Sequence, residues 1–204
     1  MPINRIRLGK IHTIHKESGL NASDNFWYEP NFVKANLVKP ENNKDLIKKF
    51  KLYKEKIWSL NYSSIIEEAL MRYVRAFDER DQNLAFLKLW TAIETLTTPN
   101  QADYKKLAKR VAFIFPDPEY HKQVLMHLIE YRNDSVHAGE QSEKAKKHSY
   151  LLQYYFHKLI LFHLINDYKF NDLNEANEFL DLPHNLADLN SKHQLLENAI
   201  RFKS

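Results

Sequence analysis

The feature that most restricts the fold is a spacing of apolar residues at three or four positions, which begins near Pro40 and continues almost to the end of the chain. Its first segment has apolar or aromatic side chains at Leu46, Phe50, Tyr53, Ile57 and Leu60. Such spacing forms one apolar stripe along a helix. The pattern predicts helices at about 42–58, 64–79, 82–97, 101–115, 118–138 and 142–168, then a short helix and a last one at about 185–202. Short connections favour antiparallel neighbours, so we expect an all-α, up-and-down helical bundle.

Local signals refine some of these helices. Ser64 and Glu67 predict a capping box at the start of the second helix, and Pro118 is a favourable first-turn residue for the fifth. Residues 151–165 are almost continuously apolar, yet they are too few and too polar to span a bilayer. Such a helix lies at the centre of a bundle or on a dimer face. We expect the fifth and sixth helices to lie side by side.

Residues 1–39 lack the helical spacing. Alternation between Ile3 and Leu8, followed by Ile11 and Ile14, predicts a short strand or an extended arm. We therefore divide the chain into an N-terminal extended or short-strand segment, residues 1–39, and a helical domain, residues 40–204. Alternatively, the first segment is the remnant of a larger upstream domain.

Composition argues against several kinds of site. The 204 residues include no cysteine, so we expect no disulfide, thiolate nucleophile or metal–thiolate centre. Three glycines are too few for a glycine-rich phosphate loop, and no His-Glu-x-x-His occurs, so we expect neither a cofactor nor a metal. The first residues lack the apolar run of a signal peptide, which makes the cytoplasm the expected location and a membrane partner unexpected. The net charge of +4 is compatible with a polyanionic partner.

One stretch, residues 130–140, gathers an arginine, an amide and a histidine: Arg132, Asn133 and His137. On a helix Asn133 and His137 lie four positions apart on one face, so the amide could orient the imidazole. Arg132 lies about 140° around the axis from His137 and would approach a ligand from the flank. Gly139 suits the position after a helix end, which places His137 in the last turn, where an imidazole can act as acid or base near neutral pH. The alternative is that Arg132 extends over the surface and His137 only caps the helix.

The stretch from Arg132 to His137, Arg-Asn-Asp-Ser-Val-His, resembles the Arg-polar-x-x-x-His signature of the HEPN superfamily of helical domains. Its surroundings are similar to the Apea-like HEPN branch in the segments 87–96, 107–112 and 128–133, which a hydrophobic helix follows. The resemblance covers roughly residues 60–170. Many HEPN proteins are metal-independent endoribonucleases that act as dimers, often in antiviral defence or toxin systems, while others are inactive interaction or nucleotide-associated modules. The resemblance therefore implies an HEPN-like bundle in which Arg132, Asn133 and His137 are the catalytic residues.

A carboxylate on another predicted helix is a candidate supporting residue. Glu94 falls on the same helical stripe as Leu87 and Trp90, which predicts that it is partly buried. The resemblance places this helix opposite the motif helix, from which Glu94 would orient Arg132 or His137. The alternative is a structural ion pair with a lysine or another arginine.

Basic side chains close to the motif in the sequence are candidate contacts for RNA phosphates. Those in the fourth helix form two rows of residues four positions apart, and the others follow the motif directly: Lys105, Lys106, Lys109, Arg110, Lys144 and Lys147. Phosphate contacts of this kind make binding sensitive to salt. The alternative is that these side chains are simply solvated helix faces.

These expectations combine into one hypothesis: a metal-independent HEPN-type endoribonuclease that cleaves RNA through attack of the 2′-hydroxyl, leaving a 2′,3′-cyclic phosphate. Because Arg132 and His137 diverge on one helix, two chains would have to bring their motifs together, which predicts a homodimer. An inhibitory or activating protein partner belongs to the hypothesis, since an active nuclease must be restrained in its host. The alternatives are a non-catalytic helical module for dimerisation or interaction and a nucleotide-binding domain.

Overall fold

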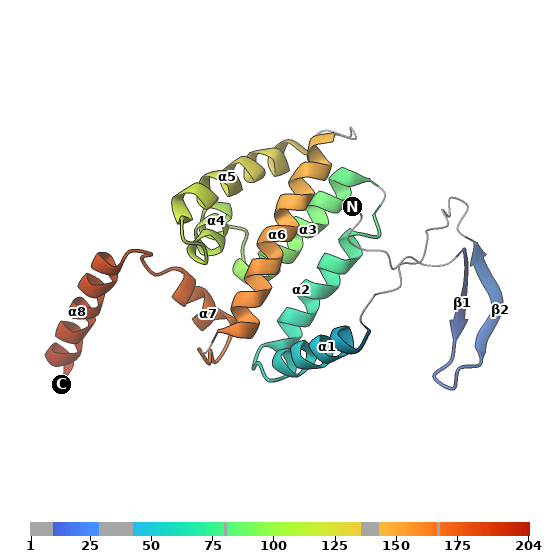
Figure 1. The fold of residues 1–204 in the computed structure, drawn as a ribbon, viewed down its shortest axis with the longest axis horizontal. Coiled ribbons are helices and arrows are strands. Elements are labelled where there is room, and N and C mark those ends of the chain that lie inside the picture. The colour runs from blue at the N-terminus through green and yellow to red at the C-terminus, as the bar shows by residue number, and fades with distance from the viewer. Residues whose placement is uncertain (1–9, 29–42, 80, 136–142, 167) are drawn as a thin grey trace. The chain divides into compact units, whose positions relative to one another are not determined.

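A computed structural model describes residues 10–28, 43–79, 81–135, 143–166 and 168–204. In these ranges it has two strands and eight helices (Figure 1), which confirms the all-α expectation with a short strand segment near the N-terminus. The elements are β1 (Ile11–His15), β2 (Asn21–Tyr28), α1 (Asn43–Trp58), α2 (Ser63–Ala76), α3 (Gln82–Thr97), α4 (Tyr104–Phe113), α5 (Pro118–Ser135), α6 (Glu143–Ile165), α7 (Leu173–Leu180) and α8 (Leu186–Lys203). Contacts between residues divide the chain into two compact units, residues 1–47 and 48–204.

The two strands form an antiparallel hairpin in the first unit. Ile11 pairs with Tyr28, and the register is irregular between Thr13 and His15. The turn contains Gly19 at φ +82°, a left-handed conformation that side chains with a Cβ rarely adopt. The expected strand segment is therefore present at Ile11–His15, whereas the alternation between Ile3 and Leu8 lies outside the described residues. The strand pairs with a second one that the apolar spacing did not predict.

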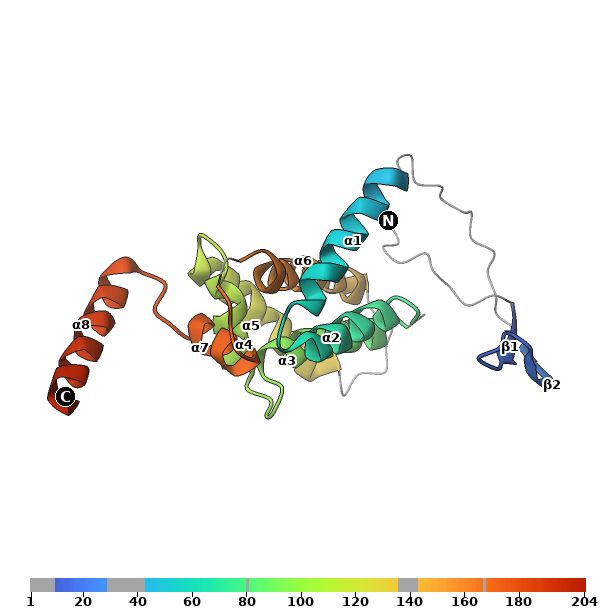
Figure 2. The ribbon, with the colours of Figure 1, turned by 90° about the horizontal axis from the view of Figure 1, so that it is seen from below.

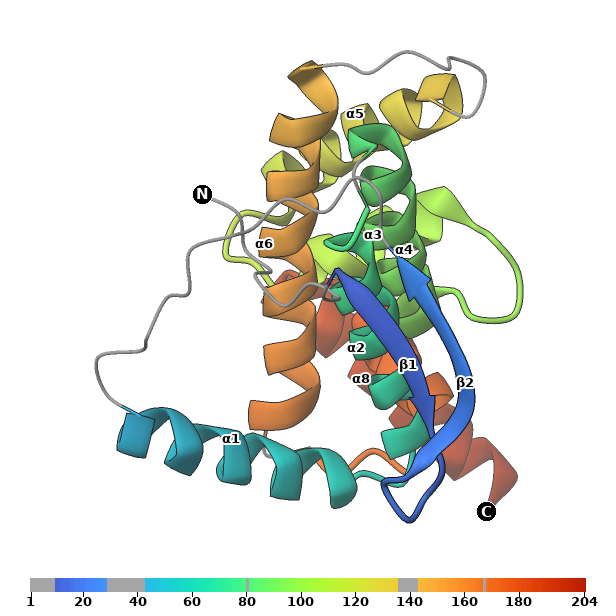
Figure 3. The ribbon, with the colours of Figure 1, turned by 90° about the vertical axis from the view of Figure 1, so that its right-hand side faces the viewer.

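Helix α3 is the central element of the second unit. It packs against α2, α4, α5 and α6, and Figures 1 and 3 show α2, α3 and α6 running alongside one another. Lys88 and Glu94 are its only charged residues, and Phe86, Leu89 and Ile93 are fully buried. Helices α4, α5 and α7 lie on the side of α3 away from α2 (Figure 2). A helix that is apolar around most of its circumference takes such a position because every face can be buried.

Side chains of α5 and α6 contact each other at two places, so the two helices predicted to be neighbours do touch. Near the end of α5, the ring of Tyr131 lies 4.3 Å from that of His148 near the start of α6. Near the start of α5, His121 Nδ1 lies 3.0 Å from the hydroxyl of Tyr155, further along α6. These contacts position the end of α5, where Arg132 and Asn133 lie, beside the start of α6.

Helices α6 and α8 differ in how many of their side chains are buried. Helix α6 buries Leu152 and Phe156 but exposes Leu151 and Tyr154, so it flanks the centre that α3 occupies. Helix α8 buries none of its residues. Within the described ranges, no helix combines the length and the apolar character that a membrane crossing requires.

The capping box predicted for Ser64 and Glu67 is wrong. Helix α2 is preceded by Tyr62, whose side chain makes no capping hydrogen bond. Glu67 instead accepts a hydrogen bond from the indole of Trp58 at 3.1 Å. A contact with α1 therefore takes the carboxylate that the local sequence assigned to the helix cap.

Candidate functional site

The C-terminal end of α5 carries the first two residues of the predicted motif. The helix begins at Pro118, as predicted, and its last turn contains Arg132 and Asn133. Arg132 is half-buried and Asn133 is exposed, and Arg132 Nη1 lies at a long hydrogen-bond distance of 3.5 Å from Asn133 Oδ1. His137 lies outside the described residues, so its place in the site stays a prediction.

The guanidinium of Arg132 lies over the ring of Tyr104, the first residue of α4, with Cζ 4.9 Å from the ring centre. Such a contact contributes about 0.5–1 kcal/mol when exposed and about 2 kcal/mol when desolvated. The buried Nε of Arg132 finds no acceptor among the described residues. An unsatisfied buried donor costs about 1–3 kcal/mol. The protein thus holds this cation in place while part of its hydrogen-bonding capacity is unused.

Glu94 of α3 lies within electrostatic reach of the same cation. It is half-buried, as its helical stripe predicted, and accepts a hydrogen bond from Trp90 Nε1 at 3.0 Å. Burial raises the pKa of Glu94, and the Trp90 hydrogen bond and the charges of Arg132 and Arg72 only partly offset that rise. We refer to Glu94, Tyr104 and Arg132 as the Arg132 cluster. Three helices contribute one residue each to it.

A hollow of about 330 Å³ lies beside Glu94. Helix α2 contributes Glu68 and Arg72, which form an ion pair at 2.6 Å, and the segment 98–102 after α3 forms another wall. The hydroxyl of Thr91, also in the lining, donates to the backbone one turn earlier and keeps its oxygen available as an acceptor. With two carboxylates and one guanidinium, the hollow suits a group that donates hydrogen bonds.

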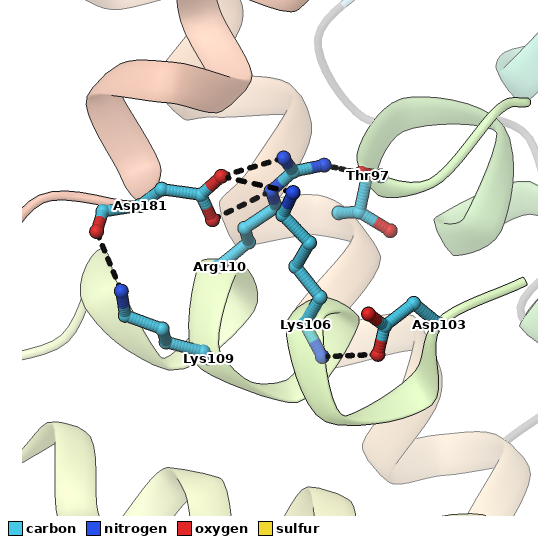
Figure 4. A network of polar contacts seen from close by, with 6 residues as sticks. All are labelled: Thr97, Asp103, Lys106, Lys109, Arg110 and Asp181. Carbon is cyan, nitrogen blue, oxygen red and sulfur yellow. Dashed lines mark hydrogen bonds and ion pairs between the residues drawn. The ribbon is translucent and has the colours of Figure 1, made fainter. Parts of the chain in front are cut away.

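Arg110 on α4 belongs to a different set of contacts (Figure 4). Its guanidinium donates to both carboxylate oxygens of Asp181, at 2.9 and 2.7 Å, and to the carbonyl of Thr97. Lys109 donates to the backbone carbonyl of Asp181, and Lys106 Nζ lies 3.5 Å from its carboxylate. Burial alone would raise the pKa of Asp181, but the hydrogen bonds and charge of Arg110, with both lysines, lower it below its usual value. We refer to these five residues as the Arg110 network.

The Arg110 network includes three of the six cations predicted to contact phosphate. Arg110 is only 8% exposed, and its guanidinium bonds join the ends of α3 and α7 to α4. The five predicted cations other than Arg110 are all exposed, including the two lysines of the network: Lys105, Lys106, Lys109, Lys144 and Lys147. Phosphate binding by any of the six stays a prediction.

Sequence reasoning did not identify Tyr104 or Arg72 as residues of the site. Tyr104 falls within the helix predicted at about 101–115, but the spacing does not connect it with Arg132. Arg72, on α2, pairs with Glu68 four positions earlier, a spacing that the sequence does contain but that did not indicate the neighbouring charge of Glu94 on α3. Spacing within one helix does not report a pair formed between two helices, so no signal in this sequence would have found either contact.

The sequence matches no model of a known protein family, and comparisons with curated proteins and with solved structures found no match either. Within the part of the chain that the structure describes, no three His, Asp or Glu side chains are grouped so that they could hold a metal ion. The function is therefore inferred from the chemistry of the Arg132 cluster.

Proposed function

We propose that this protein is a metal-independent endoribonuclease of the HEPN type. The observation that carries the proposal is Arg132, a cation held at the end of α5 by the ring of Tyr104 and the nearby charge of Glu94. One of its donors is buried without an acceptor among the described residues. Rotation of the guanidinium toward an RNA phosphodiester would give its donors the bidentate acceptor that arginine binds best.

In the proposed reaction, the 2′-hydroxyl oxygen of one nucleotide attacks the adjacent phosphorus and expels the 5′-oxygen of the next nucleotide. The products are a 2′,3′-cyclic phosphate and a 5′-hydroxyl end. His137 accepts the proton of the attacking hydroxyl or protonates the leaving oxygen. Arg132 stabilises the charge that builds on the phosphoryl oxygens. Asn133 orients the imidazole, and Glu94 positions Arg132.

The same proposal includes the assembly and the setting. On the helix that the spacing predicts, Arg132 and His137 would diverge by about 140°, so in this proposal two chains together complete a site and the active form is a homodimer. The exposed lysines near the motif in the sequence contact the RNA backbone. We place the enzyme in the cytoplasm, in antiviral defence or a toxin system, under the control of an inhibitory or activating protein.

The test is cleavage of a fluorescently labelled single-stranded RNA in EDTA. Wild-type protein should cleave it and leave cyclic phosphate ends, and His137→Ala should lower the rate about 10²–10⁴-fold. His127→Ala, which changes an exposed histidine of α5, is the matched control and should cleave at the wild-type rate. Equal rates for wild type and His137→Ala would remove His137 from the mechanism.

A second candidate is a non-catalytic helical interaction module in which the motif serves the fold. The half-burial of Arg132 over Tyr104 favours it, since the same contact would stabilise the packing of α4 on α5. Under this alternative the chain does not cleave RNA, and Arg132→Ala lowers the free energy of unfolding by about 2 kcal/mol, the upper value for a desolvated contact of this type.

A further inference from the structure

A groove of about 520 Å³ lies between α1, α2 and α6, where α1 runs across the other two helices (Figure 3). Apolar side chains form most of its walls: Phe50, Tyr53 and Ile57 from α1, Leu70 from α2, and Ile160 and Leu161 from α6. Phe50 is 67% exposed and Trp58, at the edge, is 62% exposed. Apolar concavities that keep aromatic surface in water are typical of sites that bind another molecule. None of these residues belongs to the Arg132 cluster or the Arg110 network.

Two tertiary contacts fix the wall that α1 contributes. Lys56 Nζ donates to the carbonyl of Leu164 at 3.0 Å, at the C-terminal end of α6, where the helix dipole favours a cation. The indole of Trp58 donates to Glu67 of α2. Because both contacts lie at one end of α1, they hold its last turns against α2 and α6. The groove is therefore already formed without a ligand.

Helix α1 makes the surroundings of this groove basic, although the lining itself has one lysine and one glutamate, Lys54 and Glu67. Residues 48–58 contain five lysines and one glutamate, an excess equal to the net charge of +4 of the whole chain. Lys48 and Lys51 are exposed, and Lys54 lines the groove with its Nζ 4.2 Å from the ring centre of Trp58. A ligand that fills the apolar centre would therefore meet cations at its edge.

We propose that this groove binds an acidic amphipathic helix of a partner protein. Such a helix inserts apolar side chains spaced three or four positions apart into a groove. Aspartates and glutamates on its flanks would lie close to Lys51 and Lys54. This electrostatic match speeds association and selects against basic partners. The inference does not depend on the proposed nuclease activity.

Two other occupants fit the charge or the shape less well. Helix α8 has an exposed apolar stripe of its own, formed by Leu186, Leu189, Leu196 and Ile200, with Leu189 only partly exposed. However, α8 contains three Lys or Arg residues against two acidic ones, so the α8 of a second copy would meet like charge in the groove. An anionic membrane surface matches the charge, but a flat surface does not fill a concave site.

The experiment selects 18-residue peptides from a randomised phage-displayed library on the full chain, then measures the affinity of synthetic peptides by titration calorimetry. The selected peptides should combine apolar residues spaced three or four apart with an excess of aspartate and glutamate. Phe50→Ala should weaken their binding at least tenfold, as expected for an aromatic residue central to an interface. Lys51→Glu with Lys54→Glu should weaken binding, and by a larger factor at low salt than at high salt.

Matched controls lie on α8. Phe202→Ala removes an aromatic ring that is 83% exposed, and Lys192→Glu reverses an exposed charge; both should bind the peptides as wild type does. Because Phe50 is itself largely exposed, Phe50→Ala should keep the wild-type circular dichroism spectrum and melting temperature. RNA cleavage by Phe50→Ala should match that of wild type, which separates this inference from the proposed function.

Several results would overturn the proposal. Peptides that bind Phe50→Ala as well as wild type, an absence of enrichment, or selected peptides without an acidic excess would each do so. A dimer that both Phe50→Ala and Ile200→Glu dissociate in analytical ultracentrifugation would assign the groove to α8 of a second copy. Binding to phosphatidylserine vesicles that Phe50→Ala abolishes would assign it to a membrane surface.

Discussion

The Arg110 network and the Arg132 cluster place two arginines in contrasting surroundings, although α4 and α5 are packed against each other. The guanidinium of Arg110 is almost fully buried and has an acceptor in the carboxylate of Asp181 and another in a backbone carbonyl. Arg132 is half-buried over a ring and has a buried donor with no acceptor among the described residues. A satisfied buried cation stabilises the fold, whereas an incompletely satisfied one is available to a ligand. Residue type alone does not distinguish these two situations.

The largest expected effect is on RNA cleavage by the Arg132 cluster. Arg132→Ala should lower the cleavage rate about 10²–10³-fold, because a donor aimed at developing phosphoryl charge is lost. The free energy of unfolding of the Arg132→Ala variant should be lower than that of wild type by no more than about 1 kcal/mol. Initial rates on labelled RNA and urea unfolding measure the two quantities. Arg132→Lys, which keeps the charge without the planar guanidinium, should give an intermediate rate. If Arg132→Ala cleaves at the wild-type rate, Arg132 has no catalytic role and does not differ from Arg110 in function.

The second prediction concerns the stability that the Arg110 network provides. Arg110→Ala should lower the free energy of unfolding by about 2–3 kcal/mol, because it leaves Asp181 without its main partner and the Thr97 carbonyl without a donor. Urea denaturation followed by circular dichroism measures the change. Lys105→Ala, an exposed change on the same helix, should stay within about 0.5 kcal/mol of wild type. If Arg110→Ala also stays within about 0.5 kcal/mol of the wild-type free energy of unfolding, the network is not needed for stability.

The contrast also shows what the sequence could predict. Helix positions followed from apolar spacing, and the half-burial of Glu94 followed from its place on the stripe with Leu87 and Trp90, because both depend on neighbours within one helix. The partner of Arg110 did not follow, since Asp181 lies beyond three further helices and no local pattern joins the two residues. The same holds for the ring of Tyr104 beneath Arg132. The failed capping box at Ser64 has the same cause, a tertiary contact that overrides a local one.

The third prediction uses pH, because the carboxylates of the two regions have pKa values shifted in opposite directions. The pKa of Asp181 is lowered in the folded state from its ordinary 3.8, so its contribution to stability is present above that pH and is lost as pH falls through the folded value. The pKa of Glu94 is raised from its ordinary 4.5, so its contribution is present below that pH and is lost as pH rises through the folded value.

Unfolding free energies of wild type, Asp181→Asn and Glu94→Gln between about pH 3 and pH 7 test this difference. Asp181→Asn should be most destabilising at the neutral end, whereas Glu94→Gln should be least destabilising there or stabilise the protein. Burial lowers the pKa of His163 to about 4, but this group titrates in all three proteins and cancels in the differences. If the change in unfolding free energy varies with pH in the same direction for both variants, the pKa values of the two carboxylates are not shifted in opposite directions.

The smallest expected effect is the coupling between Tyr104 and Arg132. Tyr104 also contacts the ring of Trp90, at 5.9 Å between centroids, so a single substitution would mix two losses. A double-mutant cycle with Tyr104→Leu and Arg132→Gln isolates the pair and should give about 0.5–1 kcal/mol. A second cycle with Tyr120→Leu, an exposed ring at the other end of α5, should give a coupling near zero. If the first cycle also gives zero, the ring does not hold the guanidinium, and the difference between Arg132 and Arg110 reduces to their hydrogen bonds alone.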